Sequence, residues 1–542
     1  MTHTLIKNAS ILTRDPKLGD LHGSDLLIDG DRIAAVGPNL QAPPDAEVID
    51  AKGMVLMPGL IDGHRHVWEI IDMGRLVKTR PAEYAPYYQQ WKMRTIVSMT
   101  PEDNYLAELI GGLQAIDSGV TTVLDYAHGQ PSEDRAMAAA QGLRDSGIAG
   151  WFAFQLGVSS SYKPGDTVSL AKADGERIAM TNESHWKTAE RLQKELFSDS
   201  TALLQLGLAP SGNNGSRIED IRKEWTRARG MGVKMLAAHI HKPEQPHAPG
   251  VMGHRDSGMP DLYEAGLLGP DYQATHANRL TSDELKMLRD TGGMICATAM
   301  GEFPYVMSPS KGPSVHGRAR AAGVPTGMGI DISLALTGDY FEHIRATFWS
   351  LYLDPECRGY VGRYTSEDIL DFATSMGAQA VRLGGVTGTI TVGKRADLVL
   401  LSTTASASAW PAASRTASSP SPARPTSTAC GSPARHASGT ARCSVSIGRT
   451  SRPGWWKRKS AWGHGPPASS SSEALRPHAR SSELHHEKNT ETLRVRRAAI
   501  GRRGIARASR RQLAEPAGAH RARLCAGRSH RPPGAPAGCA VP

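Results

Sequence analysis

The sequence contains few cysteines and no long hydrophobic run. Of its six cysteines, only Cys296 and Cys357 come before residue 402, and none has CxxC spacing. This argues against a disulfide-stabilised secreted domain and favours a reducing, cytoplasmic setting. No stretch approaches the roughly 18 uninterrupted apolar residues that a membrane-spanning helix requires. Residues 1–12 are too polar for the apolar core of a signal peptide, so we expect neither a membrane partner nor export.

Acidic residues are almost absent from the last quarter of the chain. Residues 403–542 hold 24 of the 63 lysines and arginines but only 5 of the 53 acidic residues. Residues 1–402 therefore carry 39 basic and 48 acidic residues, and the net charge of +10 comes from the tail alone. Because nucleic-acid binding needs a basic surface on the folded domain, we expect no nucleic-acid partner.

Apolar periodicity is also missing from residues 403–542, where Ala, Ser, Pro, Arg and Gly dominate. Such a segment buries too little apolar surface to offset the entropy lost on ordering. One interpretation is a disordered basic tail that binds an acidic partner. We prefer the hypothesis that the tail is translated out of frame, because high-GC genes read in a wrong frame give this residue mixture. An intact reading frame around the codons for Ser402 to Ala405 would contradict that hypothesis.

The remaining chain divides into a small β unit and a longer α/β region. Residues 1–57 contain short strands separated by turn signals, which predicts a small antiparallel β unit, and residues 386–402 supply a matching strand pair. Both ends are therefore expected to form one β-sandwich, whose edge is exposed if the tail is out of frame. In residues 58–385, strands alternate with helices, which predicts a parallel sheet, and the length suits a TIM-like (β/α)₈ barrel.

Two histidines follow the first barrel strand. Residues 58–66 read Pro-Gly-Leu-Ile-Asp-Gly-His-Arg-His, and side chains two apart on a strand share a face. His64 and His66 are therefore expected to point into the barrel mouth, where two imidazoles favour Zn²⁺ or Fe²⁺. His-x-His alone is a weak signal, because a histidine pair is more often structural, but its place after this strand makes it more specific.

The chain resembles the amidohydrolase superfamily, in the branch of cytosine deaminase, guanine deaminase and the s-triazine hydrolases. The resemblance covers residues 4–401. Besides PGLIDGHRH, it is carried by segments in the family's order and spacing: DSGVTTVLDYAH, KMLAAHIH, ATHANRLTSDEL, GMGID and GTITVGKRADLVLL.

The resemblance implies a site for one divalent ion, Zn²⁺ or Fe²⁺. His239, which ends KMLAAH, takes the third metal-histidine position beside His64 and His66. Asp331, which ends GMGID, touches the metal and accepts the proton of its water, and His276, which ends QATH, polarises the substrate. All five lie at predicted carboxyl ends of strands, where barrel active sites form. No lysine ends the strand LLQLGL to bridge a second metal.

The sequence departs from this branch after the third metal strand. Lys242 stands where many of these deaminases carry the glutamate of His-x-x-Glu, which shuttles protons. Glu302, in AMGEFP, is our catalytic candidate for that role, although a solvated loop carboxylate fits equally. His241 is either a second imidazole in the mouth or, as we favour, a surface residue, and Asp339 is better read as a helix cap. The missing glutamate weakens purine or pyrimidine deamination more than hydrolysis in general.

Substrate contacts are expected from His276, His128 and Trp68. His128 follows the strand that ends in DYA, although a packing role is about equally compatible. Trp68 opens a segment, residues 68–99, that also contains Tyr84, Tyr87, Tyr88 and Trp91. These aromatic side chains form either a lid that stacks on a flat ring or an interface between subunits.

We therefore expect a metal-dependent amidohydrolase that uses activated water to cleave a non-peptide C–N bond of a small cyclic or amidine-type substrate. It is expected to be cytoplasmic and a possible homo-oligomer. Alternatives within the family are dehalogenation and the opening of a cyclic amide. An alternative of another class is a non-catalytic scaffold or a truncated, inactive product, against which the complete set of five site residues argues.

Overall fold

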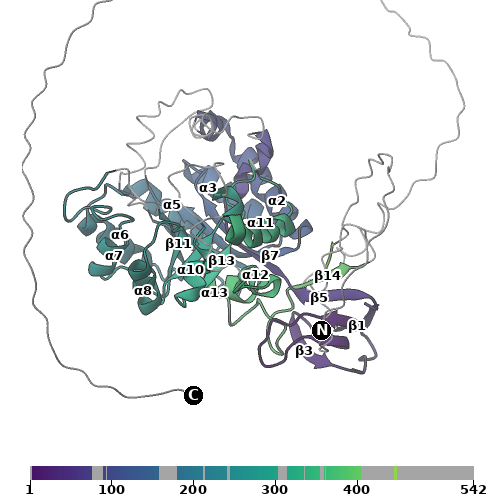
Figure 1. Ribbon diagram of the computed structural model, residues 1–542. Helices are drawn as coiled ribbons and strands as arrows, with labels where there is room; N and C mark the ends of the chain where they lie inside the picture. Colours follow the sequence, from purple (N-terminus) through teal and green to yellow (C-terminus); the bar gives the residue numbers. More distant parts are fainter. Residues whose placement is uncertain are drawn as a thin grey trace, which may run out of the picture. The chain divides into compact units, whose positions relative to one another are not determined.

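Eight parallel strands form the central sheet of the protein (Figure 1). The computed structural model describes residues 3–75, 90–92, 94–157, 180–210, 214–240, 245–302, 314–334, 336–353, 359, 362–403 and 445–448. The sheet runs in chain order as β6 (Leu60–Arg65), β7 (Val120–Ala127), β8 (Ala149–Gln155), β9 (Leu204–Ala209), β10 (Leu236–Ile240), β11 (Tyr272–His276), β12 (Met294–Ala297) and β13 (Thr326–Met328). A parallel bridge between Arg65 and Asp331 joins its first and last edges, so the predicted barrel is nearly closed.

Helices follow the strands and surround the sheet (Figure 1). They are η1 (Val67–Asp72), α2 (Pro101–Asp117), α3 (Glu133–Asp145), α5 (Glu183–Glu195), α6 (Ile218–Gly230), α7 (Met259–Glu264), α8 (Ser282–Thr291), α9 (Ala299–Glu302), α10 (His316–Ala321), α11 (Tyr340–Leu353), α12 (Ser366–Phe372) and α13 (Ser375–Ala380). Side-chain hydrogen bonds fix several starts. Thr281, for example, caps α8 through a capping box with Glu284. Nowhere in the described ranges does a helix combine the length and hydropathy that a bilayer crossing requires.

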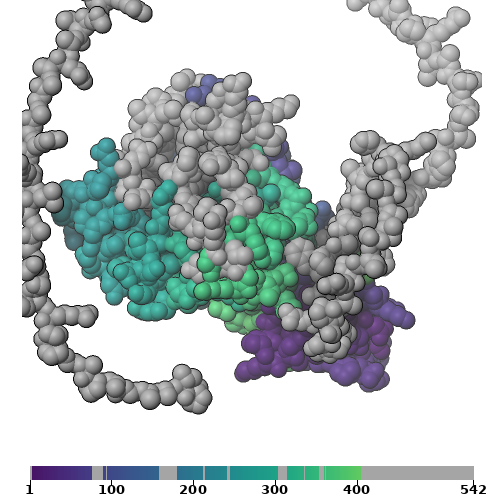
Figure 2. All heavy atoms as spheres, in the orientation of Figure 1, coloured from purple at the N-terminus to yellow at the C-terminus, as the bar shows by residue number. Residues whose placement is uncertain are grey.

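A second sheet joins both ends of the family-like region, as predicted. Its strands are β1 (His3–Ile11), β2 (Leu21–Asp29), β3 (Arg32–Gly37), β4 (Glu47–Asp50), β5 (Met54–Pro58), β14 (Leu398–Ser402) and β15 (Val445–Gly448). β14 pairs antiparallel with β5, which brings Leu398 opposite Pro58. In the space-filling view, the N-terminal strands gather into one purple region (Figure 2).

Two features of this sheet differ from the expectation. The sheet is mixed rather than antiparallel, because β4 and β5 both run parallel to β1. The edge of β14, expected to be exposed, is paired with β15 from the tail, Leu398 facing Gly448. The pairing of β15 supplies backbone partners that the tail's composition did not predict. The expected disorder of the tail concerns residues 404–444 and 449–542, which lie outside the described residues.

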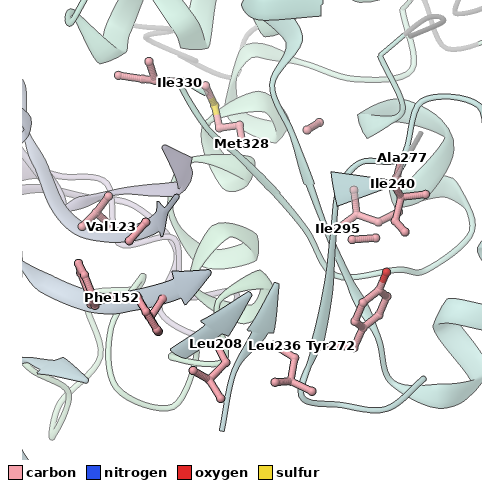
Figure 3. Close-up of a cluster of buried hydrophobic side chains, with 14 of the residues drawn as sticks. Val123, Phe152, Leu208, Leu236, Ile240, Tyr272, Ala277, Ile295, Met328 and Ile330 are labelled. Carbon is pink, nitrogen blue, oxygen red and sulfur yellow. The ribbon is translucent and has the colours of Figure 1, made fainter. Parts of the chain in front are cut away.

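The barrel core follows the two-residue alternation of its strands. Leu124 and Trp151 point into the barrel and pack with one buried cluster, whereas Val123 and Phe152 pack outward against the helices. Figure 3 shows this outward cluster, with Val123 and Phe152 on neighbouring strands. Each fully buried side chain of this size contributes roughly 1.5–3 kcal/mol, so the framework that carries the strand ends is rigid.

His185 fastens α5 to the barrel. Its ring stacks on Phe154 with centroids 4.6 Å apart, and its Nε2–H donates to the carbonyl oxygen of Gln155 at 2.8 Å. Burial lowers the pKa of His185 to about 4, although the hydrogen bond to Gln155 acts in the opposite direction. The folded protein therefore keeps this imidazole neutral at pH values where the unfolded chain binds a proton.

This difference predicts a pH-dependent stability. Between pH 6.5 and about 4 the unfolded chain binds a proton at His185 that the folded chain does not. The free energy of unfolding is therefore expected to fall as the pH decreases through this window, by up to about 1.4 kcal/mol per pH unit. In His185→Gln, whose amide can still donate to Gln155, that component should be missing. Urea denaturation of both proteins at several pH values measures it, and identical pH slopes would contradict the prediction.

Candidate active site

Five predicted residues meet at the carboxyl end of the barrel. One ligand atom from each of His64, His239, His276 and Asp331 lies within 4.8 Å of the others. His66 stands beside them, with Nε2 3.5 Å from Asp331 Oδ1 and its ring centroid 4.9 Å from that of His64. The strands therefore bring the whole set together. The most compact group contains His276 in place of His66.

Local backbone geometry turns two of these side chains into the mouth. His276 and Asp331 have φ values of 66° and 71°, in the left-handed region that residues other than glycine rarely adopt. Such conformations persist where the surroundings hold them, often at functional sites. Gly329 allows the close approach behind Asp331, because a Cβ there would lie 2.4 Å from the carbonyl oxygen of His64.

Hydrogen bonds orient the histidines for ligation. His66 Nδ1 donates to the carbonyl oxygen of Tyr126 at 2.9 Å, which leaves Nε2 facing Asp331. His64 Nδ1 lies 3.5 Å from Thr275 Oγ1, and its buried Nε2 makes no hydrogen bond among the described residues, although it faces Asp331 Oδ1 at 3.4 Å. Burial and the neighbouring His64 lower the pKa of His66 to about 3. His66 is therefore neutral near pH 7, which is the form that binds metals.

This donor set fits a divalent metal ion. Imidazole nitrogens and a carboxylate oxygen are the ligands of Zn²⁺ and non-haem Fe²⁺ sites. The buried His64 Nε2, which has no hydrogen bond, points to a partner of this kind. In the described part of the chain, no other group of at least three such side chains converges as closely.

Glu302 lies directly behind His276. Its Oε1 is 2.8 Å from His276 Nδ1 and accepts a 2.7 Å hydrogen bond from Thr298 Oγ1. The Thr298 hydroxyl is itself 3.0 Å from His276 Nδ1. Both side chains are buried, so Glu302 is placed as an internal partner of the imidazole rather than as a solvated loop carboxylate.

His128 stacks on His66, and Trp68 meets His128 edge to face. The ring of His128 lies on that of His66 with centroids 3.8 Å apart, and the Trp68 Nε1–H donates to His128 Nδ1 at 2.9 Å. Trp68 is fully buried and stacks on Trp91 at 5.5 Å. His128 Nε2 lies 3.9 Å from Glu69 Oε1, and burial lowers the pKa of His128 well below its ordinary value.

Six other positions also stand out in the sequence. Tyr84, Tyr87 and Tyr88 are outside the described residues, as are His241 and Lys242. Asp339 accepts a 2.9 Å hydrogen bond from the backbone N–H of Phe341, which agrees with a capping role at the start of α11.

Three site residues were missed by sequence reasoning. The ring of Tyr126 lies 4.2 Å from that of His239 and 5.5 Å from that of His64. As described above, Thr298 contacts the imidazole of His276, and Glu69 lies near that of His128. The alternation of β7 marked Tyr126 as pointing inward with Leu124, and this signal was available. Nothing local in the sequence marked Thr298 or Glu69.

This combination of barrel and donor set defines a hydrolase of the metal-dependent barrel class. Residues 55–428 match the model of the amidohydrolase family. The chain belongs to the amidohydrolase family.

Two characterised relatives match most of the chain. The 5'-deoxyadenosine deaminase of Methanosarcina acetivorans is 26% identical over 404 residues, which cover 74% of this chain and 84% of that protein. An isoxanthopterin deaminase from an unknown prokaryotic organism is 24% identical over 441 residues, with 73% and 84% covered.

Solved structures share the fold. An adenosine deaminase from Xanthomonas campestris with bound zinc superposes with a TM-score of 0.60 at 18% identity, and the match covers 74% of this chain and 84% of that one. Atrazine chlorohydrolase from Arthrobacter aurescens, complexed with zinc, gives 0.57 at 18% identity, with 73% and 87% covered.

Proposed function

We propose that this protein hydrolyses a non-peptide C–N bond of a small cyclic or amidine-type substrate, as a deaminase does, with one bound divalent metal ion. The convergence of His64, His239, His276 and Asp331 within 4.8 Å at the barrel mouth carries this proposal. Membership of the amidohydrolase family and the deaminases among its relatives support it.

We assign the metal to His64, His66, His239 and Asp331. When bound, the ion lowers the pKa of a water molecule towards about 7 and so supplies the nucleophile. Asp331 accepts the proton of the attacking water at a carboxylate oxygen and returns it to the departing nitrogen. The Tyr126 carbonyl keeps His66 Nε2 directed at this centre.

His276, supported by Glu302, donates a second proton, which goes to the substrate. With the Glu302 carboxylate against Nδ1, His276 can carry a proton on each nitrogen and donate from Nε2 to the substrate atom that gains negative charge. Glu302 thereby takes over the role of the glutamate that Lys242 replaces. His128 and Trp68 are proposed to form the substrate-binding wall beside this pair, with the fully buried Trp68 holding His128 through its indole N–H.

Metal analysis combined with a product screen tests the function. We expect one Zn²⁺ or Fe²⁺ per chain, loss of activity on chelation, and recovery when either ion is added back. A panel of aminated heterocycles, halogenated triazines and cyclic amides should be assayed for ammonia, for halide and for ring-opened product. Ammonia release supports the proposal, whereas halide or ring-opened product supports the alternatives within the family. A folded protein that binds no stoichiometric metal would support the scaffold alternative.

We also propose that the enzyme acts in the cytoplasm and forms a homo-oligomer. The scarcity of cysteine in residues 1–402 supports the first. Large apolar side chains exposed on the helices, including Ile110 at 52% and Trp349 at 54%, support the second. Sedimentation of the purified chain tests the oligomeric state, and a monomer at every concentration would contradict it.

A further inference from the structure

The barrel closes between β6 and β13 through one short backbone bridge. The Asp331 N–H donates to the carbonyl oxygen of His64 at 3.0 Å, and the His66 N–H donates to that of Asp331 at 2.9 Å. Within the described residues, this bridge between Arg65 and Asp331 is the direct backbone pairing across the seam. Its three bonded residues are also proposed metal ligands, so the ligand spacing depends on how firmly the seam is held.

Side chains strengthen this seam on both sides of the bridge. Asp62 Oδ1 accepts from the Ile330 N–H at 3.1 Å. The Tyr340 hydroxyl lies 2.5 Å from the Ile61 carbonyl oxygen and 2.9 Å from that of Met328, and so spans the first and last strands. Closure is therefore performed largely by buried polar groups.

Arg65 adds the contact nearest to the ligands. It stands between His64 and His66 in the chain, and strand alternation turns its side chain to the face opposite theirs. Its Nη2 donates to Gln114 Oε1 at 2.6 Å and to Ser333 Oγ at 3.0 Å. Gln114 belongs to α2, and Ser333 lies two residues after Asp331. One guanidinium group thus connects β6, α2 and the segment that carries Asp331.

The guanidinium group of Arg65 lies in a buried site lined by carboxyl groups. Arg65 is fully buried, a position that is costly for a charge without compensation. The carboxyl groups of Asp62, Asp125 and Glu108 surround it and favour its charged form, and all three side chains are also fully buried. Burial raises the pKa of Asp62 and of Asp125 to about 7 and that of Glu108 well above its ordinary value, so the cluster carries fewer than three full negative charges near pH 7. Asp125 additionally accepts from the Val67 N–H at 3.1 Å, immediately after His66. The cluster therefore holds the backbone on both sides of His66.

We propose that Arg65 is a positioning residue of the metal centre. By joining Gln114 and Ser333, it closes the seam and sets the distance between the histidines of β6 and Asp331. The inference rests on the proposed function, because it concerns the affinity and geometry of the same metal site. An arginine that served only general stability would change the unfolding free energy and leave the folded protein's metal site unaltered.

Two variants separate these roles. Arg65→Lys keeps the positive charge but lacks the planar fork of donors that arginine offers to two acceptors, and Ser333→Ala removes one acceptor alone. Arg229→Lys is the matched control. Arg229 on α6 makes a two-donor contact with Asp271, which directly precedes β11, and this contact lies away from the seam. Thermal unfolding of each variant records general stability.

The first measurement is the Zn²⁺ affinity of folded protein, determined by competition with a chromophoric chelator. We expect Arg65→Lys to bind Zn²⁺ about 10–100-fold more weakly, as is typical when a supporting partner of a ligand is lost. Ser333→Ala should bind several-fold more weakly, and Arg229→Lys as the wild type does. The visible spectrum of the Co²⁺-substituted protein should shift in Arg65→Lys only. Wild-type affinity and spectrum in Arg65→Lys would overturn the proposal. Should the lysine variant not fold, the Zn²⁺ affinity of Ser333→Ala decides, and a wild-type affinity of that variant would overturn the proposal.

The second measurement needs no metal. In metal-free protein, the amides of His66 and Asp331 form the bridge itself, so their hydrogen exchange reports on the seam. Both amides should exchange faster in Arg65→Lys than in Arg229→Lys, and equal exchange rates would contradict the proposal that Arg65 closes the seam. If the wild-type protein binds no metal and the two variants still differ in exchange rate, only the proposed function is contradicted.

Discussion

Replacing Asp331 with asparagine is expected to reduce kcat by about 10³-fold or more, while the barrel remains folded. The amide has nearly the same shape but cannot accept the proton of the attacking water, and general-base contributions reach 10²–10⁴-fold. It is also a poorer ligand than the carboxylate that lies 3.4 Å from His64 Nε2 and 3.5 Å from His66 Nε2. Steady-state kinetics on the best substrate, metal content and thermal unfolding should be measured together.

Asp339→Asn provides the control for this variant. Asp339 lies eight residues further along and caps α11 through the Phe341 N–H, and asparagine can make that same contact. We therefore expect nearly wild-type kcat. If the Asp331→Asn variant binds metal and keeps a tenth of the wild-type kcat, another group accepts the proton.

The effect of Asp331 could be anticipated because strand ends can be read from sequence. Each metal-binding candidate follows an apolar strand, as in KMLAAH before His239 and GMGID at Asp331, and parallel strands bring their carboxyl ends to one face. A period-two pattern therefore indicates both the strand and the end where chemistry occurs. Matching short strands at both ends of residues 4–401 also predicted that residues 386–402 join the N-terminal strands, and β14 does so by pairing with β5.

Contacts made only by tertiary packing were not predictable in this way. Thr298 reaches His276 because β11 and β12 are neighbours and α9 begins at once after β12. The burial of Trp68 depends on Trp91 and on Gly129, where a Cβ would lie 2.7 Å from the indole ring. Likewise, β15 pairs through backbone groups that every sequence possesses. Such contacts leave no periodic trace in the chain.

Replacing Glu302 with glutamine is expected to lower kcat by about 10²-fold and to leave the metal content unchanged. A glutamine keeps the volume and can still accept from Thr298, but a neutral amide does not stabilise the positive charge of a doubly protonated His276. The imidazole then loses the form that donates from Nε2. KM should change little, because Glu302 is buried behind His276 and is not placed to touch the substrate.

Thr298→Val tests whether the charge or the surrounding hydrogen bonds matter. It removes the hydroxyl that lies 2.7 Å from Glu302 Oε1 and 3.0 Å from His276 Nδ1 but keeps the carboxylate. We expect a loss of less than about tenfold, because the carboxylate remains and the hydrogen bond from Thr298 is present both before and during the proton transfer, so only part of its roughly 1.5–3 kcal/mol affects kcat. Glu302→Asp, which restores the charge on a shorter side chain, should recover part of the activity lost in the glutamine variant. If valine and glutamine reduce kcat equally and aspartate restores nothing, the carboxylate charge has no part in the proton transfer, and His276 acts through its neutral form.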